Sequence, residues 1–262
     1  MKKYTLKGLS ILNLLGFFGI VLINYLAVTL PLNNKTTGAL ADQYPNLFVP
    51  VGLTFSIWGI IYLLLGIFIV YQLVYAFKKD TQNSSFLEKI GILFFVSCLA
   101  NFTWIFAWHF EMVPLSLFIM LILLISLIVI YQKLNIGRLE ASKSEKYLVH
   151  LPFSVYLGWI TIATIANTTA LLVDLHWNRF GLSEPFWTIA VIIIGVLIAF
   201  FMLFYRKDIF YCLVVDWALL GILIKRLTVD IVKVQSIIIV VSLGLVMISL
   251  GIIIQITRKK VY

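Results

Sequence analysis

Long apolar runs, separated by short polar segments, fill most of the sequence. We count eight runs, at residues 9–30, 48–77, 90–110, 113–131, 148–173, 186–205, 209–224 and 234–256. A helix needs about 20 apolar residues to span the hydrocarbon core of a bilayer. Most of the runs approach or exceed that length, and the seventh is the shortest. The pattern therefore predicts an all-α, polytopic membrane protein with eight transmembrane helices.

The composition supports this class and excludes several others. Hydrophobic residues make up 62% of the chain and charged residues 12%, which is about half the charge of a typical soluble protein. A net charge of +9 is therefore explained by cytoplasmic loops rather than by nucleic acid binding. The cysteines, Cys98 and Cys212, lie inside apolar runs and indicate neither a disulfide framework nor a metal site. We identify no catalytic residues, and the sequence favours a protein that is not an enzyme.

The distribution of Lys and Arg sets the orientation. Of the 20 basic residues, fifteen fall in segments on the side of the N-terminus and five in the opposite loops. Cytoplasmic loops carry such an excess, so we place both termini in the cytoplasm. Separately, we expect the membrane to be a bacterial cell membrane. The longest segment on the outer side, residues 32–47, either covers a cavity or simply connects two helices.

The fifth run carries aromatic and polar residues at helical spacing. Trp159, Ala163 and Asn167 recur every four residues, and Tyr156 extends the same face. An amide in hydrocarbon is costly unless it finds a partner. This face should therefore point toward other helices or toward a bound molecule. Interhelical packing and ligand binding are both open as interpretations.

The second and third runs repeat this combination. Trp58, Tyr62 and Gly66 again follow one another at steps of four. Trp58 lies roughly 15 Å from the outer end of its run at 1.5 Å per residue, too deep for an interfacial aromatic belt. Asn101 and Trp104 lie one turn apart near the middle of the third run. Helix packing alone seldom requires amide side chains beside tryptophans in the middle of two separate helices.

Three other tryptophans flank the ends of apolar runs, and for them the interfacial belt is the better interpretation. They are Trp108, Trp177 and Trp187.

Asp216 is the only acidic residue that we place deep inside an apolar run. A charged Asp at a helix centre costs roughly 2.5–3.5 kcal/mol on insertion scales, so we expect this side chain to face protein. One interpretation is a proton or cation site in the last three helices. The other is a structural hydrogen bond that ties the seventh helix to the bundle, and this one is favoured because no second carboxylate lies at similar depth.

These motifs resemble those of the TspO/MBR family, the translocator proteins or tryptophan-rich sensory proteins. The family's second-helix pattern of Trp, Tyr at +4 and a small residue at +8 is similar to Trp58, Tyr62 and Gly66. Its third-helix pattern, Asn-x-x-Trp with an aromatic residue further on, is similar to Asn101, Trp104 and Trp108. Its fifth-helix pattern is similar to Tyr156, Leu157, Trp159, Ala163 and Asn167.

The resemblance covers about residues 9–173. It implies a TspO-like five-helix bundle at residues 1–175 and leaves a three-helix extension at residues 176–262. The family's Trp-Tyr and Trp-x-Pro-Pro motifs before the second helix are absent here. By resemblance, the bundle encloses a pocket for a porphyrin or another flat hydrophobic molecule. The ligand-binding residues that it implies are Trp58, Tyr62, Asn101, Trp104, Tyr156, Trp159, Ala163 and Asn167.

The function that the resemblance implies is ligand binding or sensing inside the membrane, with a porphyrin or haem bound but no cofactor required. The alternative is a secondary transporter or permease for a small hydrophobic or amphipathic molecule. Transporters usually show more intramembrane charge and more interrupted helices, so this alternative ranks second. The implied partners are the lipid bilayer, the small ligand and a second copy of the chain, since family members are often homodimers.

Overall fold

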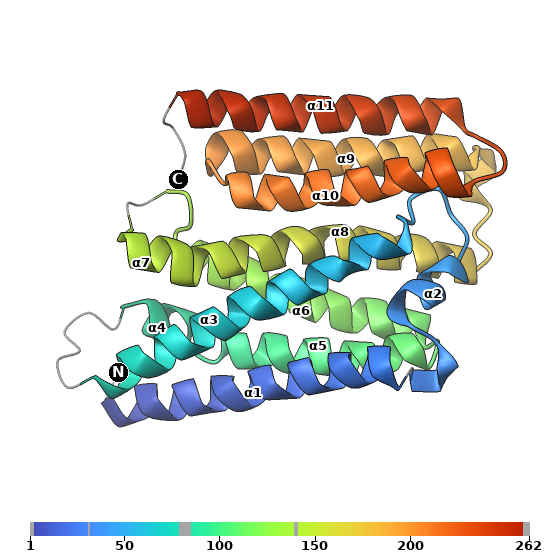
Figure 1. Ribbon diagram of the computed structural model, residues 1–262. Helices are drawn as coiled ribbons and strands as arrows, with labels where there is room; N and C mark the ends of the chain where they lie inside the picture. Colours follow the sequence, from blue (N-terminus) through green and yellow to red (C-terminus); the bar gives the residue numbers. More distant parts are fainter. Residues whose placement is uncertain (1–2, 31, 79–84, 139–140, 259–262) are drawn as a thin grey trace. The chain divides into compact units, whose positions relative to one another are not determined.

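The computed structural model describes residues 3–30, 32–78, 85–138 and 141–258, and the regular structure in these ranges is helical throughout. Figure 1 shows long helices that follow the apolar runs in order. Within the described ranges, six helical stretches are long and apolar enough to cross a membrane. The all-helical class is confirmed, while eight transmembrane helices stay a prediction. Lys2, Lys79, Lys259 and Lys260, which enter the orientation argument, lie outside the described residues.

Eight helices of 16 residues or more account for most of the described chain. They are α1 (Lys3–Thr29), α3 (Ile57–Phe77), α5 (Leu93–His109), α6 (Val113–Lys133), α8 (Leu151–Asp174), α9 (Glu184–Tyr205), α10 (Ile209–Ile224) and α11 (Gln235–Thr257). The shorter helices are α2 (Thr37–Asp42), α4 (Ser85–Ile90) and α7 (Lys143–Glu145), with 3₁₀ turns at Leu32–Asn34, Gly52–Ser56 and Arg179–Gly181 and π turns at Lys146–His150 and Lys225–Val229.

The backbone breaks regular α-helix near the start of the second and third apolar runs. Val51 is extended, with φ −64° and ψ 147°, so the second run starts as a 3₁₀ turn and becomes α3 only at Ile57. In the third run Gly91 has a φ of +54°, a left-handed conformation that glycine adopts at little cost. This residue separates α4 from α5, which therefore starts at Leu93 rather than at residue 90.

The chain forms two compact units, and each is described separately. The first consists of Met1–Thr36 and Trp58–Leu157, and the second of Thr37–Ile57 and Gly158–Tyr262. The boundary thus falls inside the continuous helix α8. The expected division of the sequence into residues 1–175 and 176–262 stays a prediction, because it concerns family relationship rather than compactness.

The first unit is built around helices α1, α3, α5 and α6. Its core contains Phe68, Phe94 and Phe153, whose ring centroids lie 5.1–5.9 Å apart in edge-to-face contacts. A polar contact joins α1 to α3, since the amide of Asn13 donates to Gln72 Oε1 at 3.0 Å. Both of these side chains are fully buried. This bond satisfies one donor and one acceptor that would each be costly alone in an apolar core.

In the second unit α9, α10 and α11 pack together, and glycines on α11 permit the close approach. A Cβ on Gly244 would lie 2.9 Å from Val196 of α9, and one on Gly251 would lie 2.6 Å from Leu203. Small residues at helix contacts are typical of membrane proteins, where packing rather than water exclusion drives association. One turn beyond Gly251, the amide of Gln255 donates to the carbonyl of Leu203 at 3.0 Å.

Residues 37–57 are a folded part of the second unit. Lys225 forms an ion pair with Asp42. The backbone amide of Val51 donates to the carbonyl of Gly221 at 3.0 Å. Trp217 Nε1 donates to the carbonyl of Thr54 at 2.9 Å. These contacts hold the segment before α3 to one end of α10.

Candidate ligand site

Four aromatic side chains from three helices form a cluster around Trp58 in the first unit. The ring of Tyr62, one turn along α3, stacks on Trp58 with a centroid distance of 5.5 Å. Trp104 of α5 lies 6.5 Å from Trp58. Tyr156 of α8 meets the same indole edge-on at 6.2 Å. Trp104 and Tyr156 are buried, whereas Trp58 and Tyr62 remain partly exposed. Sequence reasoning expects all four residues in one site, and the structure brings them together.

Asn101 supplies the polar part of this cluster. Its amide nitrogen donates to the hydroxyl of Tyr156 at 2.9 Å, and its oxygen accepts from Asn24 Nδ2 at 3.1 Å. Asn101 is fully buried. Because both ends of the amide are paired, it is stable in an apolar interior. The network joins α1, α5 and α8. A hydrogen bond between helices is the role expected if such amides serve interhelical packing rather than ligand binding.

Sequence reasoning missed Asn24. Asn24 has no aromatic residue one turn away on its own helix, so no motif drew attention to it. The rule that a polar side chain deep in a span needs a partner would have singled it out. The same rule would have found Asn13 and Gln72.

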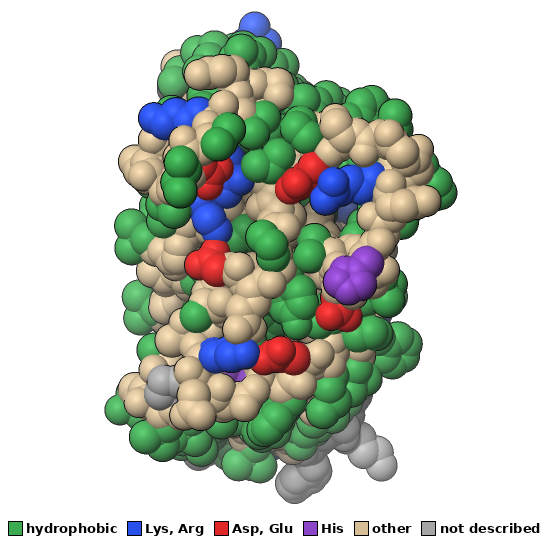
Figure 2. Space-filling view, turned by 90° about the vertical axis from the view of Figure 1, so that its right-hand side faces the viewer, with side chains coloured by type: hydrophobic (Ala, Val, Ile, Leu, Met, Phe, Trp, Pro, Cys, Tyr) green, Lys and Arg blue, Asp and Glu red, His purple; other side chains and the backbone are tan. Residues whose placement is uncertain are grey.

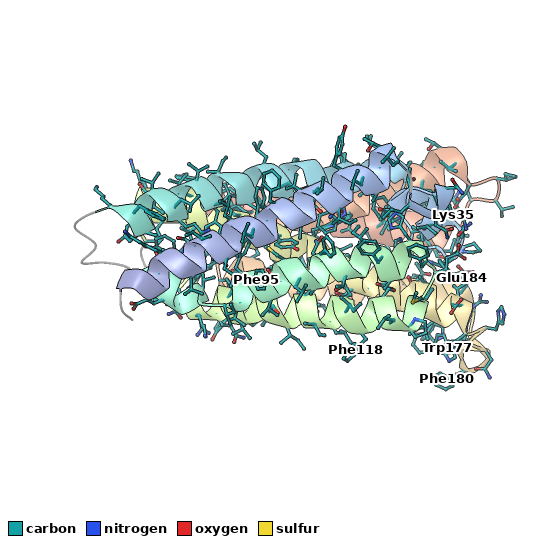
Figure 3. The ribbon with its side chains drawn as sticks, turned by 90° about the horizontal axis from the view of Figure 1, so that it is seen from below. Lys35, Phe95, Phe118, Trp177, Phe180 and Glu184 are labelled. Carbon is teal, nitrogen blue, oxygen red and sulfur yellow. The ribbon has the colours of Figure 1, made fainter. Side chains whose placement is uncertain are left out.

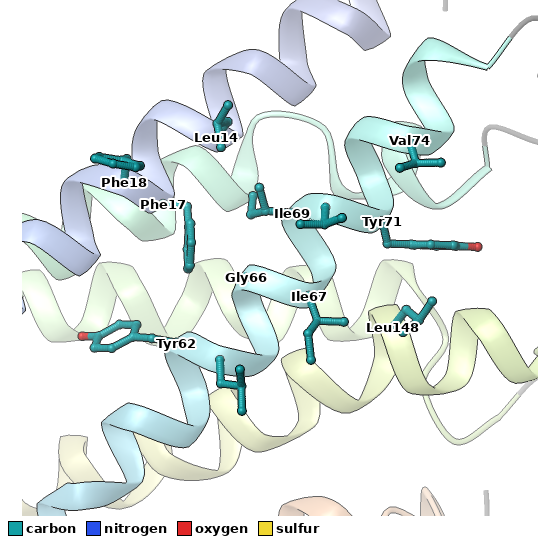
Figure 4. A pocket seen from close by; sticks show the side chains of 12 residues that line it. Leu14, Phe17, Phe18, Tyr62, Gly66, Ile67, Ile69, Tyr71, Val74 and Leu148 are labelled. Atoms are coloured by element: carbon teal, nitrogen blue, oxygen red, sulfur yellow. The ribbon is translucent and has the colours of Figure 1, made fainter.

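An apolar groove of about 730 Å³ opens beside the cluster, between α1 and α3. Figure 4 shows Phe17 and Phe18 of α1, Tyr62 and Gly66 of α3, and Leu148 around it. A Cβ on Gly66 would lie 3.3 Å from the ring of Phe17, so the glycine keeps this wall of the groove open. Tyr62 belongs to both features, because it lines the groove and stacks on Trp58.

The remaining expected residues lie on the part of α8 that belongs to the second unit. Trp159 is buried, and Phe55 meets its ring edge-on at 5.9 Å. Asn167 is also buried, and Ala163 is partly buried. Their membership in the same ligand site as Trp58 stays a prediction.

The structure contradicts the interfacial-belt interpretation for one of the three tryptophans to which it was applied, and for the other two it stays a prediction. Trp108 is buried and stacks on Trp104 with a centroid distance of 5.9 Å, so the expectation for this residue was wrong. The reason is the spacing of four residues, which places Trp108 on the inward face of α5. Trp177 and Trp187 contact each other at 4.9 Å.

Asp216 points toward α11 rather than away from protein. Its carboxylate accepts a hydrogen bond from Ser249 Oγ at 2.9 Å, and the side chain is only partly exposed. This hydrogen bond joins α10 to α11, so its partner lies in the last three helices and not in the five-helix bundle, where the favoured interpretation placed it. A role as a proton or cation site stays a prediction.

Among the described residues, no three His, Cys, Asp or Glu side chains lie close enough together to hold a metal ion. Cys98 and Cys212 are buried free thiols.

The fold and this site define an all-helical integral membrane protein with an aromatic and amide cluster in its interior. The chain belongs to the TSPO-like protein family, whose sequence pattern it matches over residues 10–254. The matched region extends beyond residue 173, through α9 and α10 and into α11. Comparison with curated proteins and with solved structures found no match.

Proposed function

We propose that this protein is a TspO-type ligand-binding or sensory protein that holds a flat hydrophobic molecule, such as a porphyrin, beside Trp58 and Tyr62. The observation that carries the proposal is the double position of Tyr62. Its ring lines the groove between α1 and α3 and also stacks on Trp58, the centre of the aromatic cluster. A ligand in the groove therefore meets an aromatic surface that is already held in place.

The groove suits such a ligand in size and in chemistry. Its volume of about 730 Å³ lies within the range of small-molecule sites, which is roughly 300–1,000 Å³. Apolar side chains form most of its lining, and offset stacking on aromatic rings favours planar molecules. No cofactor is required for this role, since the bound molecule is itself the ligand.

The residues that we propose for the site fall into two groups. Tyr62 would contact the ligand, while Trp58, Trp104, Asn101 and Tyr156 would hold its ring in position. Trp159, Ala163 and Asn167, on α8, would add the contacts that the family motif implies.

The experiment is a titration of the purified protein with protoporphyrin IX, followed through the Soret absorbance of the porphyrin. Trp58 acts through Tyr62, whose ring it stacks on, and the loss of such an aromatic contact costs about 0.5–1.5 kcal/mol. Because the ring of Tyr62 is then no longer held in position, we expect Trp58→Leu to weaken binding by up to roughly tenfold. Trp177→Leu, which changes an indole of the second unit, serves as the control and should bind as the wild type does. Equal protoporphyrin affinities of wild type and Trp58→Leu would show that the aromatic cluster does not contribute to the ligand site.

Transport is the second candidate function, and Asp216 is the observation that favours it. A carboxyl group held between two membrane helices by Ser249 is a suitable proton carrier if it titrates during function. Uptake of a hydrophobic amine into vesicles that rises with an imposed pH gradient, and that Asp216→Asn abolishes, would favour transport over sensing.

A further inference from the structure

A second pocket lies entirely within the second unit, where α8 ends and α9 begins. Its volume is about 720 Å³, and it differs from the groove beside Tyr62 in containing charged side chains. The loop between the two helices and residues 45–46 form part of its wall. Because α8 and α9 are both long and apolar enough to cross a membrane, this pocket lies where the chain leaves the bilayer. Figure 2 shows a face of the molecule on which charged and histidine side chains lie among hydrophobic side chains and other surface.

One wall of this pocket is aromatic and held in a fixed arrangement. Trp177 and Trp187 lie 4.9 Å apart at an angle of 58°. Trp187 Nε1 donates to the carbonyl of Arg179 at 2.9 Å, which ties α9 to the preceding loop. Phe180 meets Trp177 edge-on at 5.3 Å, and Figure 3 shows both at this end of the molecule. The aliphatic side chains of Leu172, Val173 and Val191 also line the pocket.

Two opposite charges line the polar end of the pocket. Glu184 Oε1 accepts from the backbone amide of Leu47 at 2.9 Å, so this carboxylate is fixed at the start of α9. Arg179 Nη2 lies 3.7 Å from Glu184 Oε2, which is longer than a hydrogen bond. The two side chains expose 46% and 32% of their surface, so both keep hydrogen-bonding capacity for a ligand. Glu184 also faces the buried guanidinium of Arg226, which has its own ion pair with Asp230 at 3.1 Å.

We propose that this pocket binds an amphiphile whose head carries both an anionic and a cationic group. The anion pairs with Arg179, whose planar guanidinium suits phosphate or carboxylate. The cation lies at Glu184, beside the indoles of Trp177 and Trp187, where cation–π attraction adds to the ion pair. The apolar part lies along Leu172 and Val191. A zwitterionic membrane lipid has this chemistry and is present at this depth, and a soluble zwitterion shares only the head.

The test uses the full chain in dodecyl maltoside micelles and a phosphatidylcholine with dibrominated acyl chains, since bromine quenches nearby tryptophans. A diacylglycerol with the same brominated chains is the reference. We expect saturable quenching by the phosphatidylcholine at a concentration roughly tenfold lower than for the diacylglycerol, because hydrogen bonds to charged groups are lost in the reference. This difference should disappear in Trp177→Phe/Trp187→Phe, which assigns the signal to the pocket. Equal quenching curves for the two lipids would mean that Trp177 and Trp187 only form part of an interfacial aromatic belt, and this result would overturn the proposal.

Variants that remove the two charges then test where the lipid headgroup binds. Arg179→Gln/Glu184→Gln should raise the half-quenching concentration of the phosphatidylcholine to that of the diacylglycerol. Lys35→Gln/Glu111→Gln removes an ion pair of the first unit and should leave the curve unchanged. Glycerophosphocholine, which has the head without chains, should not compete at the same concentration. Competition by it, or an unchanged curve in the Arg179/Glu184 variant, would contradict the proposal.

Discussion

The side-chain amide of Asn101 donates a hydrogen bond to the hydroxyl of Tyr156 at 2.9 Å, and this bond joins α5 to α8 in the first unit. Both side chains are buried, and Tyr156 also contacts the indole of Trp58. The bond therefore positions one wall of the aromatic cluster as well as connecting two helices.

Removing this bond should cost a measurable but small amount of stability. Interhelical hydrogen bonds in membrane proteins average about 0.6 kcal/mol and reach about 1.7 kcal/mol. We expect Tyr156→Phe to lower the free energy of unfolding in mixed micelles by about 1 kcal/mol. In a double-mutant cycle with Asn101→Ala, the two changes should be coupled by a similar amount. Strictly additive effects would mean that the bond contributes nothing to stability.

Among the glycines in the described part of the second unit, Gly221 leaves the least room for a Cβ. A Cβ at this position would lie 1.9 Å from Thr54 Oγ1 and 2.9 Å from Thr54 Cβ, so Gly221→Ala must displace the 3₁₀ turn. Overpacking of this kind costs typically 1–3 kcal/mol, and we expect a loss of that size in thermal unfolding. Gly195→Ala on α9 is the control, because its new Cβ would meet only Ile162 at 3.9 Å. A Gly221→Ala protein as stable as the control would show that the turn does not pack on α10.

The orientation of the chain can be checked by labelling single cysteines in intact cells. Asn34 and Ser142 lie in segments that the charge distribution assigns to opposite sides of the membrane. We expect a membrane-impermeant maleimide to label Asn34→Cys and to spare Ser142→Cys. The native Cys98 and Cys212 are buried, and the unmodified protein gives the background. Labelling of both positions from the same side would refute the eight-span topology.

Asp216 can be tested as a structural residue. Asp216→Asn keeps an acceptor for Ser249 Oγ, so we expect its stability to lie within about 0.5 kcal/mol of the wild type. Asp216→Leu removes the acceptor and should lower stability by about 0.6–1.7 kcal/mol, the range for membrane hydrogen bonds. Unfolding in mixed micelles measures both. If Asp216→Leu is as stable as Asp216→Asn, the hydrogen bond to α11 is not a structural tie.

Helix positions were largely predictable because apolar length is a strong signal in a membrane protein. The run at residues 209–224 coincides with α10, Ile209–Ile224. The start of α5 was missed because apolar character continues through Gly91, and only the backbone conformation shows the break. The boundary between the compact units was also hidden, since it falls in the uninterrupted apolar sequence of α8.

The candidate site was predictable to the extent that its residues follow helical spacing. Trp58, Tyr62, Asn101 and Trp104 could be selected because each has a partner one turn away on its own helix. Asn24 could not be selected in this way, because its partner Asn101 lies on another helix. The groove itself depends on Phe17 and Gly66 from two different helices, and no pattern within one run shows that they meet.

The central claim is that a flat ligand occupies the groove between α1 and α3. The most direct measurement compares protoporphyrin IX binding to wild type, Gly66→Leu and Gly59→Leu by equilibrium titration. Gly66→Leu places a side chain in the groove against Phe17, whereas a Cβ on Gly59 of the same helix meets no atom within 4 Å. We predict that Gly66→Leu weakens binding by at least roughly tenfold, as filling a preformed site requires, and that Gly59→Leu binds as the wild type does. Equal affinities for Gly66→Leu and Gly59→Leu would contradict the account.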